Sequence, residues 1–131
     1  MYQEQAMFQA FVVPAKKQRY ADLLGTKRGR EKIRLSLDHF KDLDPSCCRK
    51  MAPGESSTAD ILRILNNLGA PPNCYVMSSD IQLDARELDL SEALEDVVGR
   101  GMGAFISCIP GELAYFEGEE RYERYICSRK R

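Results

Sequence analysis

Residues 104–128, AFISCIPGELAYFEGEERYERYICS, contain the clearest β-sheet pattern of the chain. Runs of strand-forming residues cover 104–109, 112–117 and 122–128, separated by Pro110-Gly111 and by the polar stretch 118–121. Breaks of this length and composition join neighbouring antiparallel strands. Pro-Gly prefers a type II turn, whose twist does not suit a two-residue hairpin, so we expect a looser link with a slightly shifted register at the first break. The segment predicts a three-stranded antiparallel meander.

The first of these strands carries small or apolar side chains on both faces. Alternation places Phe105, Ser107 and Ile109 on one face and Ala104, Ile106 and Cys108 on the other. A strand of this kind is typical of the interior of a sheet that is covered on both sides. We therefore expect 104–109 to be central, with helices or a second sheet layer over each face. Tyr115, Tyr122 and Tyr125 are expected to cover the sheet while their hydroxyl groups stay in water.

Four segments outside the meander have the apolar periodicity of amphipathic helices. They are 15–24, ending at Gly25; 30–40; the segment that begins at Ser57 and ends at Gly69; and 90–98, which Asp89 can cap. Residues 30–40 fit two patterns. A helix would place Ile33, Leu37 and Phe40 on one side, whereas a strand would place Ile33, Leu35 and Leu37 on one face. The many good helix formers of this segment favour the helix.

The remaining segments carry weaker patterns. Residues 7–13 are apolar almost throughout, so periodicity does not separate a buried strand from a helix, and we favour a strand that ends at Pro14. Residues 44–55, rich in Pro and Gly, are expected to form a loop. Short strands are predicted at 74–77 and, from alternating apolar residues, at 81–85.

The sequence as a whole predicts one α+β domain over residues 1–131, with three to four helices packed on a mainly antiparallel sheet. The length of 131 residues is near the commonest domain size. A content of 44% hydrophobic and 30% charged residues is that of an ordinary globular protein. Neither a repeat nor a low-complexity linker suggests a domain boundary.

The expected location is the cytoplasm. The N-terminus lacks the basic start and apolar run of a signal peptide, and the longest apolar run is too short to span a bilayer, so no membrane association is expected. The five cysteines form an odd number without regular spacing, which suits free thiols in a reducing compartment.

Neither a cofactor nor a metal is expected. Gly99, Gly101 and Gly103 resemble a phosphate-binding loop, but they lie between a predicted helix and a strand, the reverse of the order that such loops require. The vicinal pair Cys47-Cys48 lacks zinc-ligand spacing, because adjacent cysteines do not easily bind one ion together.

Positive charge is concentrated in the first part of the chain. Residues 1–50 contain eleven Lys or Arg and six Asp or Glu, whereas residues 51–131 contain eight and fourteen. The candidate binding residues are Lys16, Lys17, Arg19, Lys27, Arg28 and Arg30. Such asymmetry indicates a protein or other anionic partner, or two halves of a fold that neutralise each other. No nucleic-acid recognition motif accompanies the basic residues, and the pI of about 5.9 argues against strong nonspecific binding to nucleic acid.

The single histidine, His39, is the best candidate for a general base. In a helix, Asp42 would lie one turn away and could orient the imidazole, and Cys48 or a water molecule could act as the nucleophile. The alternative is a histidine at a helix C-terminus, where the helix dipole favours its positive charge, followed by solvated aspartates.

Three functional hypotheses follow, and they leave open whether the protein is an enzyme. The leading one is a small intracellular binding or regulatory domain whose basic helices at 16–34 contact an anionic or protein partner. The second is a small hydrolase of phosphoester or acyl substrates that uses His39. The third is a structural subunit of a homo-oligomer or larger assembly, suggested by apolar sheet faces that exceed what four short helices cover.

Overall fold

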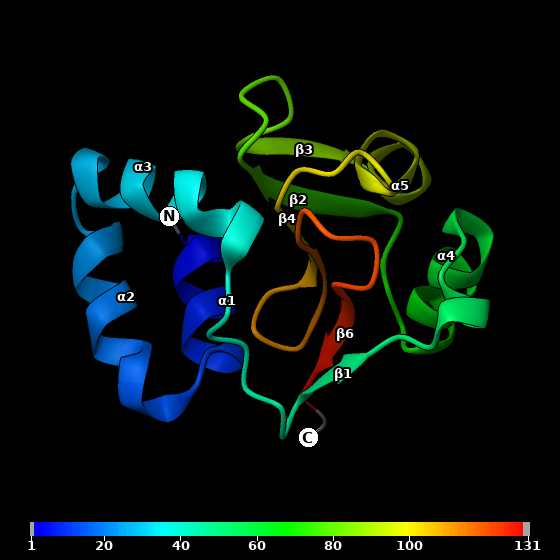
Figure 1. Ribbon diagram of the computed structural model, residues 1–131, viewed down its shortest axis with the longest axis horizontal. Coiled ribbons are helices and arrows are strands. Elements are labelled where there is room, and N and C mark those ends of the chain that lie inside the picture. Colours follow the sequence, from blue (N-terminus) through cyan, green and yellow to red (C-terminus); the bar gives the residue numbers. More distant parts are fainter. Residues whose placement is uncertain (1, 130–131) are drawn as a thin grey trace.

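The computed structural model describes residues 2–129 and shows an α+β fold with helices on both sides of one sheet (Figure 1). Within residues 2–129 there are five α-helices: α1 Tyr2–Phe11, α2 Lys17–Leu24, α3 Lys27–Ser36, α4 Thr58–Asn67 and α5 Leu90–Val97. The same residues form six strands: β1 Cys48–Lys50, β2 Asn73–Ser78, β3 Arg86–Asp89, β4 Ala104–Ile109, β5 Leu113–Glu117 and β6 Arg124–Ser128. Three short 3₁₀ helices join them: η1 Pro14–Lys16, η2 Leu37–His39 and η3 Pro53–Glu55. The predicted fold class is confirmed.

The strands form one antiparallel sheet in the order β1-β6-β5-β4-β2-β3. The predicted meander is present, because β4, β5 and β6 are adjacent in the sheet. Strand β4 lies between β5 and β2, as its two apolar faces indicated. The register between β4 and β5 shifts between Ser107 and Ile109, just before the Pro110-Gly111 link. The irregular connection expected from Pro-Gly is therefore confirmed.

Each face of the sheet has its own hydrophobic core. On one face, Val76, Ile106 and Tyr115 belong to a buried cluster that includes residues of α4 and α5. On the other face, Met77, Phe105 and Phe116 belong to a cluster that includes residues of α1, α2 and α3. Figure 1 shows the first three helices on one side of the sheet and α4 and α5 on the other.

Residues 7–13 are a correction to the sequence prediction, because residues 7–11 belong to helix α1 and only Val12 makes an isolated antiparallel bridge, to Leu43. Met7, Phe8 and Phe11 are buried, and their spacing places them on one side of the helix. The helix starts at Tyr2, where Gln3, Glu4 and Gln5 are good helix formers. The sequence did not reveal this helix, because an almost continuous apolar run is compatible with either a buried strand or a helix.

Two other predicted segments also differ from the structure. Residues 81–85 form a turn rather than a strand, in which Ala85 has a φ of 61° and the Asp80 carboxylate accepts the N–H of Gln82. The predicted loop 44–55 contains the edge strand β1 and η3. Tyr115, expected to reach water, is fully buried.

The helix preferred for residues 30–40 is confirmed as α3 followed by η2. Thr26 caps α3 by accepting the N–H of Gly29 at 3.0 Å. A Cβ atom on Gly29 would lie 2.0 Å from the carbonyl oxygen of Leu23, so the missing side chain lets α3 approach the end of α2 closely. The pair α2 and α3 forms the frame of the candidate site.

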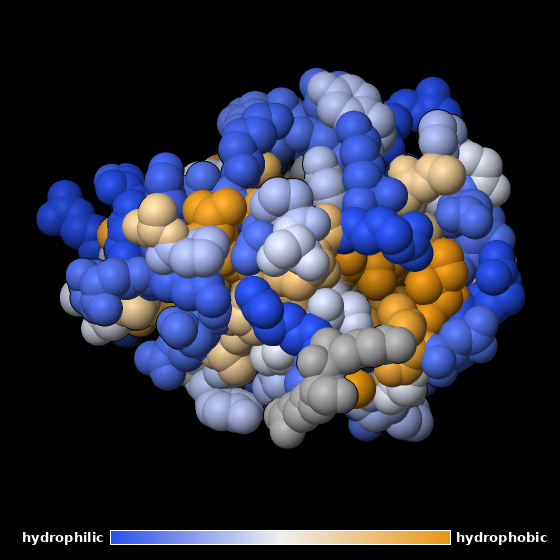
Figure 2. Space-filling model, turned by 90° about the horizontal axis from the view of Figure 1, so that it is seen from below, coloured by the Kyte–Doolittle hydropathy of each residue, from blue (hydrophilic) through white to orange (hydrophobic). Residues whose placement is uncertain are grey.

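An apolar area of the surface lies beside α4. Figure 2 shows hydrophobic side chains gathered on the lower face, on the side of the molecule where α4 lies, while most of that face is hydrophilic. Ile64, Leu68 and Ile126 line a cavity of about 420 Å³ between α4 and the end of β6. Among the helices of residues 2–129, none has the length and apolar character needed to cross a bilayer.

Candidate anion-binding cleft

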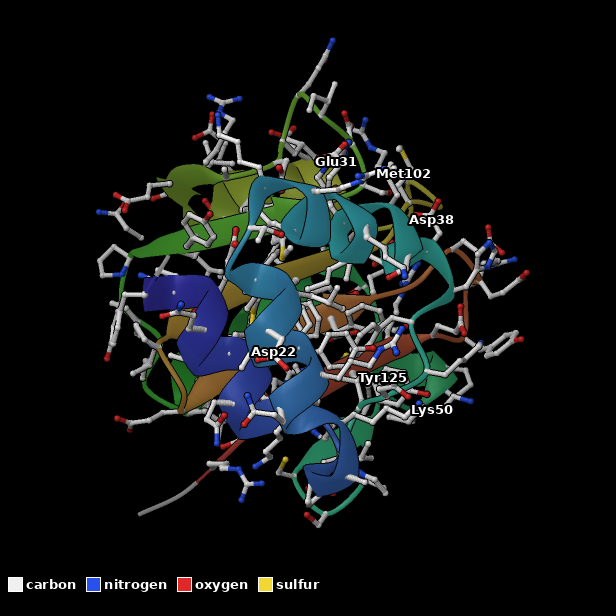
Figure 3. The ribbon with its side chains drawn as sticks, turned by 90° about the vertical axis from the view of Figure 1, so that its left-hand side faces the viewer. Asp22, Glu31, Asp38, Lys50, Met102 and Tyr125 are labelled. Carbon is white, nitrogen blue, oxygen red and sulfur yellow. The ribbon has the colours of Figure 1, made fainter. Side chains whose placement is uncertain are left out.

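A cavity of about 400 Å³ opens between α2, α3 and the segment that follows η2. Its basic lining residues come from three parts of the chain: Lys16, Arg19, Lys32, His39 and Lys41. We call this cavity the basic cleft. Asp42 is the one acidic residue among those that line it in the described part of the chain. Figure 3 looks onto this side of the molecule, with α1, α2 and α3 in front of the sheet.

The cations of the basic cleft are not equally neutralised. Lys41 Nζ lies 2.7 Å from Glu123 Oε2, and this carboxylate raises the pKa of the lysine. Lys16 Nζ lies 3.6 Å from Asp42 Oδ1. Neither Arg19 nor Lys32 makes a hydrogen bond or ion pair with any residue between 2 and 129. The cleft therefore keeps two positive charges that no carboxylate offsets.

Two aromatic residues, Tyr20 and Phe40, line the basic cleft and pack on further aromatic rings behind them. The Tyr20 ring stacks on Phe8 with centroids 5.2 Å apart, and Phe40 packs edge-on against Phe8 and Phe105. The Tyr20 hydroxyl donates a hydrogen bond of 2.5 Å to Asp42 Oδ2. Burial, and then this carboxylate, raise the pKa of Tyr20 above its usual value, so the phenol stays protonated near neutral pH.

The chain was compared with protein-family models, with curated proteins and with solved structures. No match was found in any of the three.

The structure separates the six predicted binding residues. Lys16 and Arg19 line the basic cleft. Lys17 lines a different cavity, between α1 and α2. Lys27 and Arg28 are exposed at the start of α3. The six predicted binding residues therefore do not form one patch. The cleft combines two of them, Lys16 and Arg19, with Lys32 and Lys41, which were not among the six.

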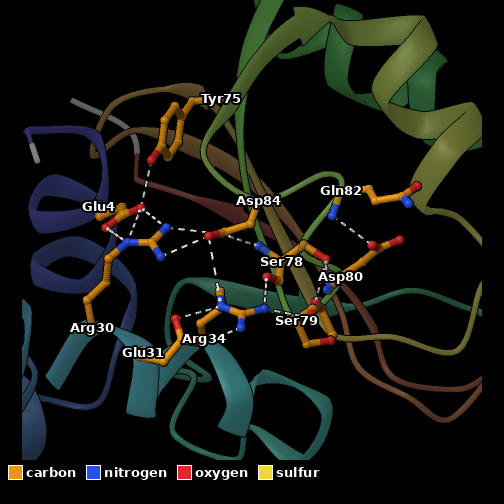
Figure 4. A network of polar contacts seen from close by, with 11 residues as sticks. Glu4, Arg30, Glu31, Arg34, Tyr75, Ser78, Ser79, Asp80, Gln82 and Asp84 are labelled. Carbon is orange, nitrogen blue, oxygen red and sulfur yellow. Dashed lines mark hydrogen bonds and ion pairs between the residues drawn. The ribbon is translucent and has the colours of Figure 1, made fainter. Parts of the chain in front are cut away.

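Arg30 lies in an internal ionic network rather than on the surface (Figure 4). Its guanidinium donates hydrogen bonds to both oxygens of Glu4, which has no exposed surface, and to both oxygens of Asp84. The Tyr75 hydroxyl donates to the same Glu4 at 2.7 Å. Arg34, 5% exposed, donates to the Ser79 carbonyl oxygen at 2.7 Å. The network ties α1 and α3 to β2 and the turn after it.

The three predicted catalytic residues do not form one group. The His39 side chain is 70% exposed, and its Nδ1 lies 2.9 Å from Glu119 Oε2. Asp42 also lines the basic cleft but bonds Tyr20 and Lys16. Cys48 is buried in β1 opposite Cys127. Among residues 2–129, no hydrogen bond or ion pair joins any two of His39, Asp42 and Cys48.

The cysteine pair has the character of a buried thiol cluster. Cys47 Sγ and Cys48 Sγ are 3.9 Å apart. Burial raises the pKa of Cys47 to about 11, whereas a hydrogen bond from Cys127 lowers the pKa of Cys48. Within the described part of the chain, no three His, Cys, Asp or Glu side chains are grouped so as to hold a metal ion.

Sequence reasoning missed three residues of the site: Lys32, Lys41 and Glu119. Lys32 lies in the basic segment 16–34, but the sequence did not distinguish it from the other basic residues there. Lys41 and its partner Glu123 are 82 residues apart, so no local pattern indicates their contact. The helical spacing that marked residues 30–40 could have placed Lys32, Ser36 and His39 on one face of the segment.

Proposed function

We propose that this protein is a small binding or regulatory domain that captures an anionic ligand or an anionic protein partner in the basic cleft. The observation that carries the proposal is the presence of two unneutralised cations, Arg19 and Lys32, at a cavity of about 400 Å³. Lys16 and Lys41 add positive charge at the same opening. A concave site lined by one sign of charge concentrates ligands of the opposite sign.

The chemistry of the cleft suits a phosphate or carboxylate group. An arginine offers paired donors that match these groups, and a lysine adds a compact charge. The apolar residues Leu23, Ile33 and Phe40 also line the cleft, so a ligand with an apolar part next to its anionic group fits better than a bare ion. The free thiols of the described cysteines support the cytoplasm as the place where this binding occurs.

The test is a titration of the intact protein with inorganic pyrophosphate and with phenyl phosphate at low ionic strength. Backbone amide NMR spectra recorded at each step report the binding. We expect chemical shift changes centred on residues 16–20 and 32–42. Arg19→Glu combined with Lys32→Glu should weaken binding by about tenfold or more, because attraction becomes repulsion.

Lys27→Glu combined with Arg28→Glu is the matched control. It makes the same change of net charge, at two positions of α3 that do not line the cleft. We expect it to weaken binding by less than about threefold, through long-range charge alone. Equal losses in both double variants, or no shifts at the cleft residues, would contradict the proposal.

A hydrolase is the second candidate function, and the pair His39–Glu119 favours it. A carboxylate at Nδ1 leaves Nε2 of the imidazole free to accept a proton from water or from a substrate. Glu119 takes the orienting role that the sequence suggested for Asp42. Turnover of p-nitrophenyl phosphate and p-nitrophenyl acetate should be screened with wild type, His39→Ala and Glu119→Gln. Turnover that His39→Ala leaves intact would exclude this function for His39.

A homo-oligomer remains the third proposal, and the apolar area beside α4 is the feature that supports it. Light scattering at high protein concentration tests it. Leu68→Glu should then dissociate the assembly, and a monomeric wild type would contradict the proposal.

A further inference from the structure

A second cavity lies beside the end of the β5–β6 connection and is lined by other residues than the basic cleft. Its volume is about 640 Å³, and it opens between the segment 50–56 and residues 121–124. Two kinds of side chain line it: the cations Lys50, Arg121 and Arg124, and the apolar or aromatic groups of Met51, Pro53 and Tyr122. We call it the Tyr122 pocket. It shares no lining residue with the basic cleft.

Tyr122 presents an aromatic ring that the core does not use. The residue is 61% exposed, whereas its neighbour Tyr125 packs against the aromatic core on the face of α1–α3. Lys50 Nζ lies 4.8 Å from the centroid of the Tyr122 ring, which is a cation–π contact. Figure 3 shows Lys50 close to Tyr125, its direct partner across β1 and β6. The contact holds the ammonium group at the edge of the pocket beside an accessible ring.

The three cations of the Tyr122 pocket differ in whether another residue of the described chain pairs with them. Arg124 donates to the Ser56 carbonyl oxygen at 2.6 Å and lies 3.5 Å from Glu117 Oε1, so it braces the wall of the pocket. Arg121 makes no hydrogen bond or ion pair with any of residues 2–129, and Lys50 has no carboxylate partner among them. Two positive charges therefore remain uncompensated next to one exposed ring.

We propose that the Tyr122 pocket binds a small flat aromatic molecule that carries a negative charge, either a nucleotide or an aromatic carboxylate. The ring of the ligand stacks on Tyr122 and contacts Met51 and Pro53, and its anionic group pairs with Lys50 and Arg121. A ligand with both parts uses the stacking surface and the free cations together, whereas a neutral ring or a bare anion uses one of them.

The test uses adenosine 5′-monophosphate and 2-naphthoate as probes on the intact protein, with adenosine and inorganic phosphate as the matched half-ligands. Spectra of protein carrying ¹³C-labelled tyrosine rings report on the site, and Tyr122→Phe assigns the Tyr122 resonances. We expect one or both probes to shift the Tyr122 ring signals and to bind about tenfold or more tightly than either half-ligand. The probe that binds more tightly shows whether the pocket prefers a nucleotide or an aromatic carboxylate.

Variants separate this site from the basic cleft. Tyr122→Leu, and Lys50→Met combined with Arg121→Gln, should each weaken probe binding by about tenfold or more. All three positions are exposed, and a thermal melt will show whether each variant is folded. The pair Arg19→Glu and Lys32→Glu should leave the probe-induced shifts of the Tyr122 ring signals unchanged, even if it abolishes binding at the basic cleft. Three results would each overturn the proposal. They are probe binding that Tyr122→Leu leaves unchanged, half-ligands that bind as tightly as the probes, and Tyr122 signals that the probes do not shift.

Discussion

Glu4 on α1 and Arg30 on α3 form an ion pair in the interior, with 2.6 Å between Glu4 Oε2 and Arg30 Nη2. The Glu4 side chain has no exposed surface, and that of Arg30 is 19% exposed. Asp84, 7% exposed, binds the other side of the same guanidinium. One arginine therefore satisfies two buried carboxylates. Its removal would leave Glu4 without a cation, whereas Asp84 would keep Arg34 Nε at 3.9 Å.

Arg30→Met should lower the free energy of unfolding by about 3 kcal/mol, because uncompensated buried charge is costly. Urea denaturation at neutral pH measures this value. Arg28→Met, on the exposed start of the same helix, is the control and should change stability by less than about 0.5 kcal/mol. Equal effects of the two substitutions would show that Arg30 acts as a surface residue, as the sequence had suggested.

A pH-dependent contribution to stability is expected from Glu117. This carboxylate is 2% exposed, and its burial raises its pKa despite hydrogen bonds from Tyr115 and Gly99. The folded state then binds the proton more tightly than the unfolded chain does. The contribution of Glu117 to stability is therefore fully present below its ordinary pKa of about 4.3, and it is lost as pH rises through the raised value.

Glu117→Gln removes this titration. The unfolding free energy of the variant, relative to wild type, should rise as pH increases from about 4 and become constant above the raised pKa. Urea denaturation at a series of pH values measures the difference. Glu95→Gln, at an exposed position of α5, should show no such rise. A difference that is flat for Glu117→Gln would contradict the assigned direction of the pKa.

The N-cap of α5 gives a third prediction. Asp89 accepts the backbone N–H groups of Ser91 at 3.0 Å and Glu92 at 3.3 Å. Asp89→Ala should lower the melting temperature near neutral pH, whereas Asp89→Asn, which can also cap, should lower it much less. A hydrogen bond from the Ser91 side chain lowers the pKa of Asp89, so the loss in Asp89→Ala should shrink as pH falls below about 3.9. Thermal melts at acidic and neutral pH compare the three proteins.

Local patterns predicted those elements whose signal lies within one segment. The capped helices α4 and α5 and the meander β4–β6 were found because caps, turn residues and alternation are local features. Strand β1 was missed because three residues of sequence Cys-Arg-Lys form a strand only when β6 pairs with them. Helix α1 was missed because an apolar run of this length is compatible with either structure.

The candidate site could be predicted only in part for the same reason. Arg19 and Lys32 lie on different helices and face one cavity because the chain turns back between α2 and α3. The contacts of His39 with Glu119 and of Lys41 with Glu123 join segments that are distant in sequence. Residue type identified His39 and Arg19 as candidates, but the tertiary fold supplied their partners.

The close approach of α2 and α3 at Gly29 leads to the last prediction. Gly29→Ala would place a Cβ atom 2.0 Å from the Leu23 carbonyl oxygen, and backbone there must move to accept it. We expect a loss of about 2 kcal/mol or more in unfolding free energy, because overpacking against backbone cannot be relieved by a rotamer change. Gly54→Ala, where nothing lies within 4 Å of the added atom, is the control and should be close to neutral.

The same substitution also tests whether the helix pair shapes the basic cleft. Leu23 lines the cleft between Arg19 and Lys32, so displacing α3 from α2 changes the distance between the two free cations. Gly29→Ala should therefore weaken pyrophosphate binding under conditions where the variant is still folded, and Gly54→Ala should not. A variant that loses stability yet binds pyrophosphate as wild type does would mean that the anion does not bridge the two helices, which contradicts its joint capture by Arg19 and Lys32.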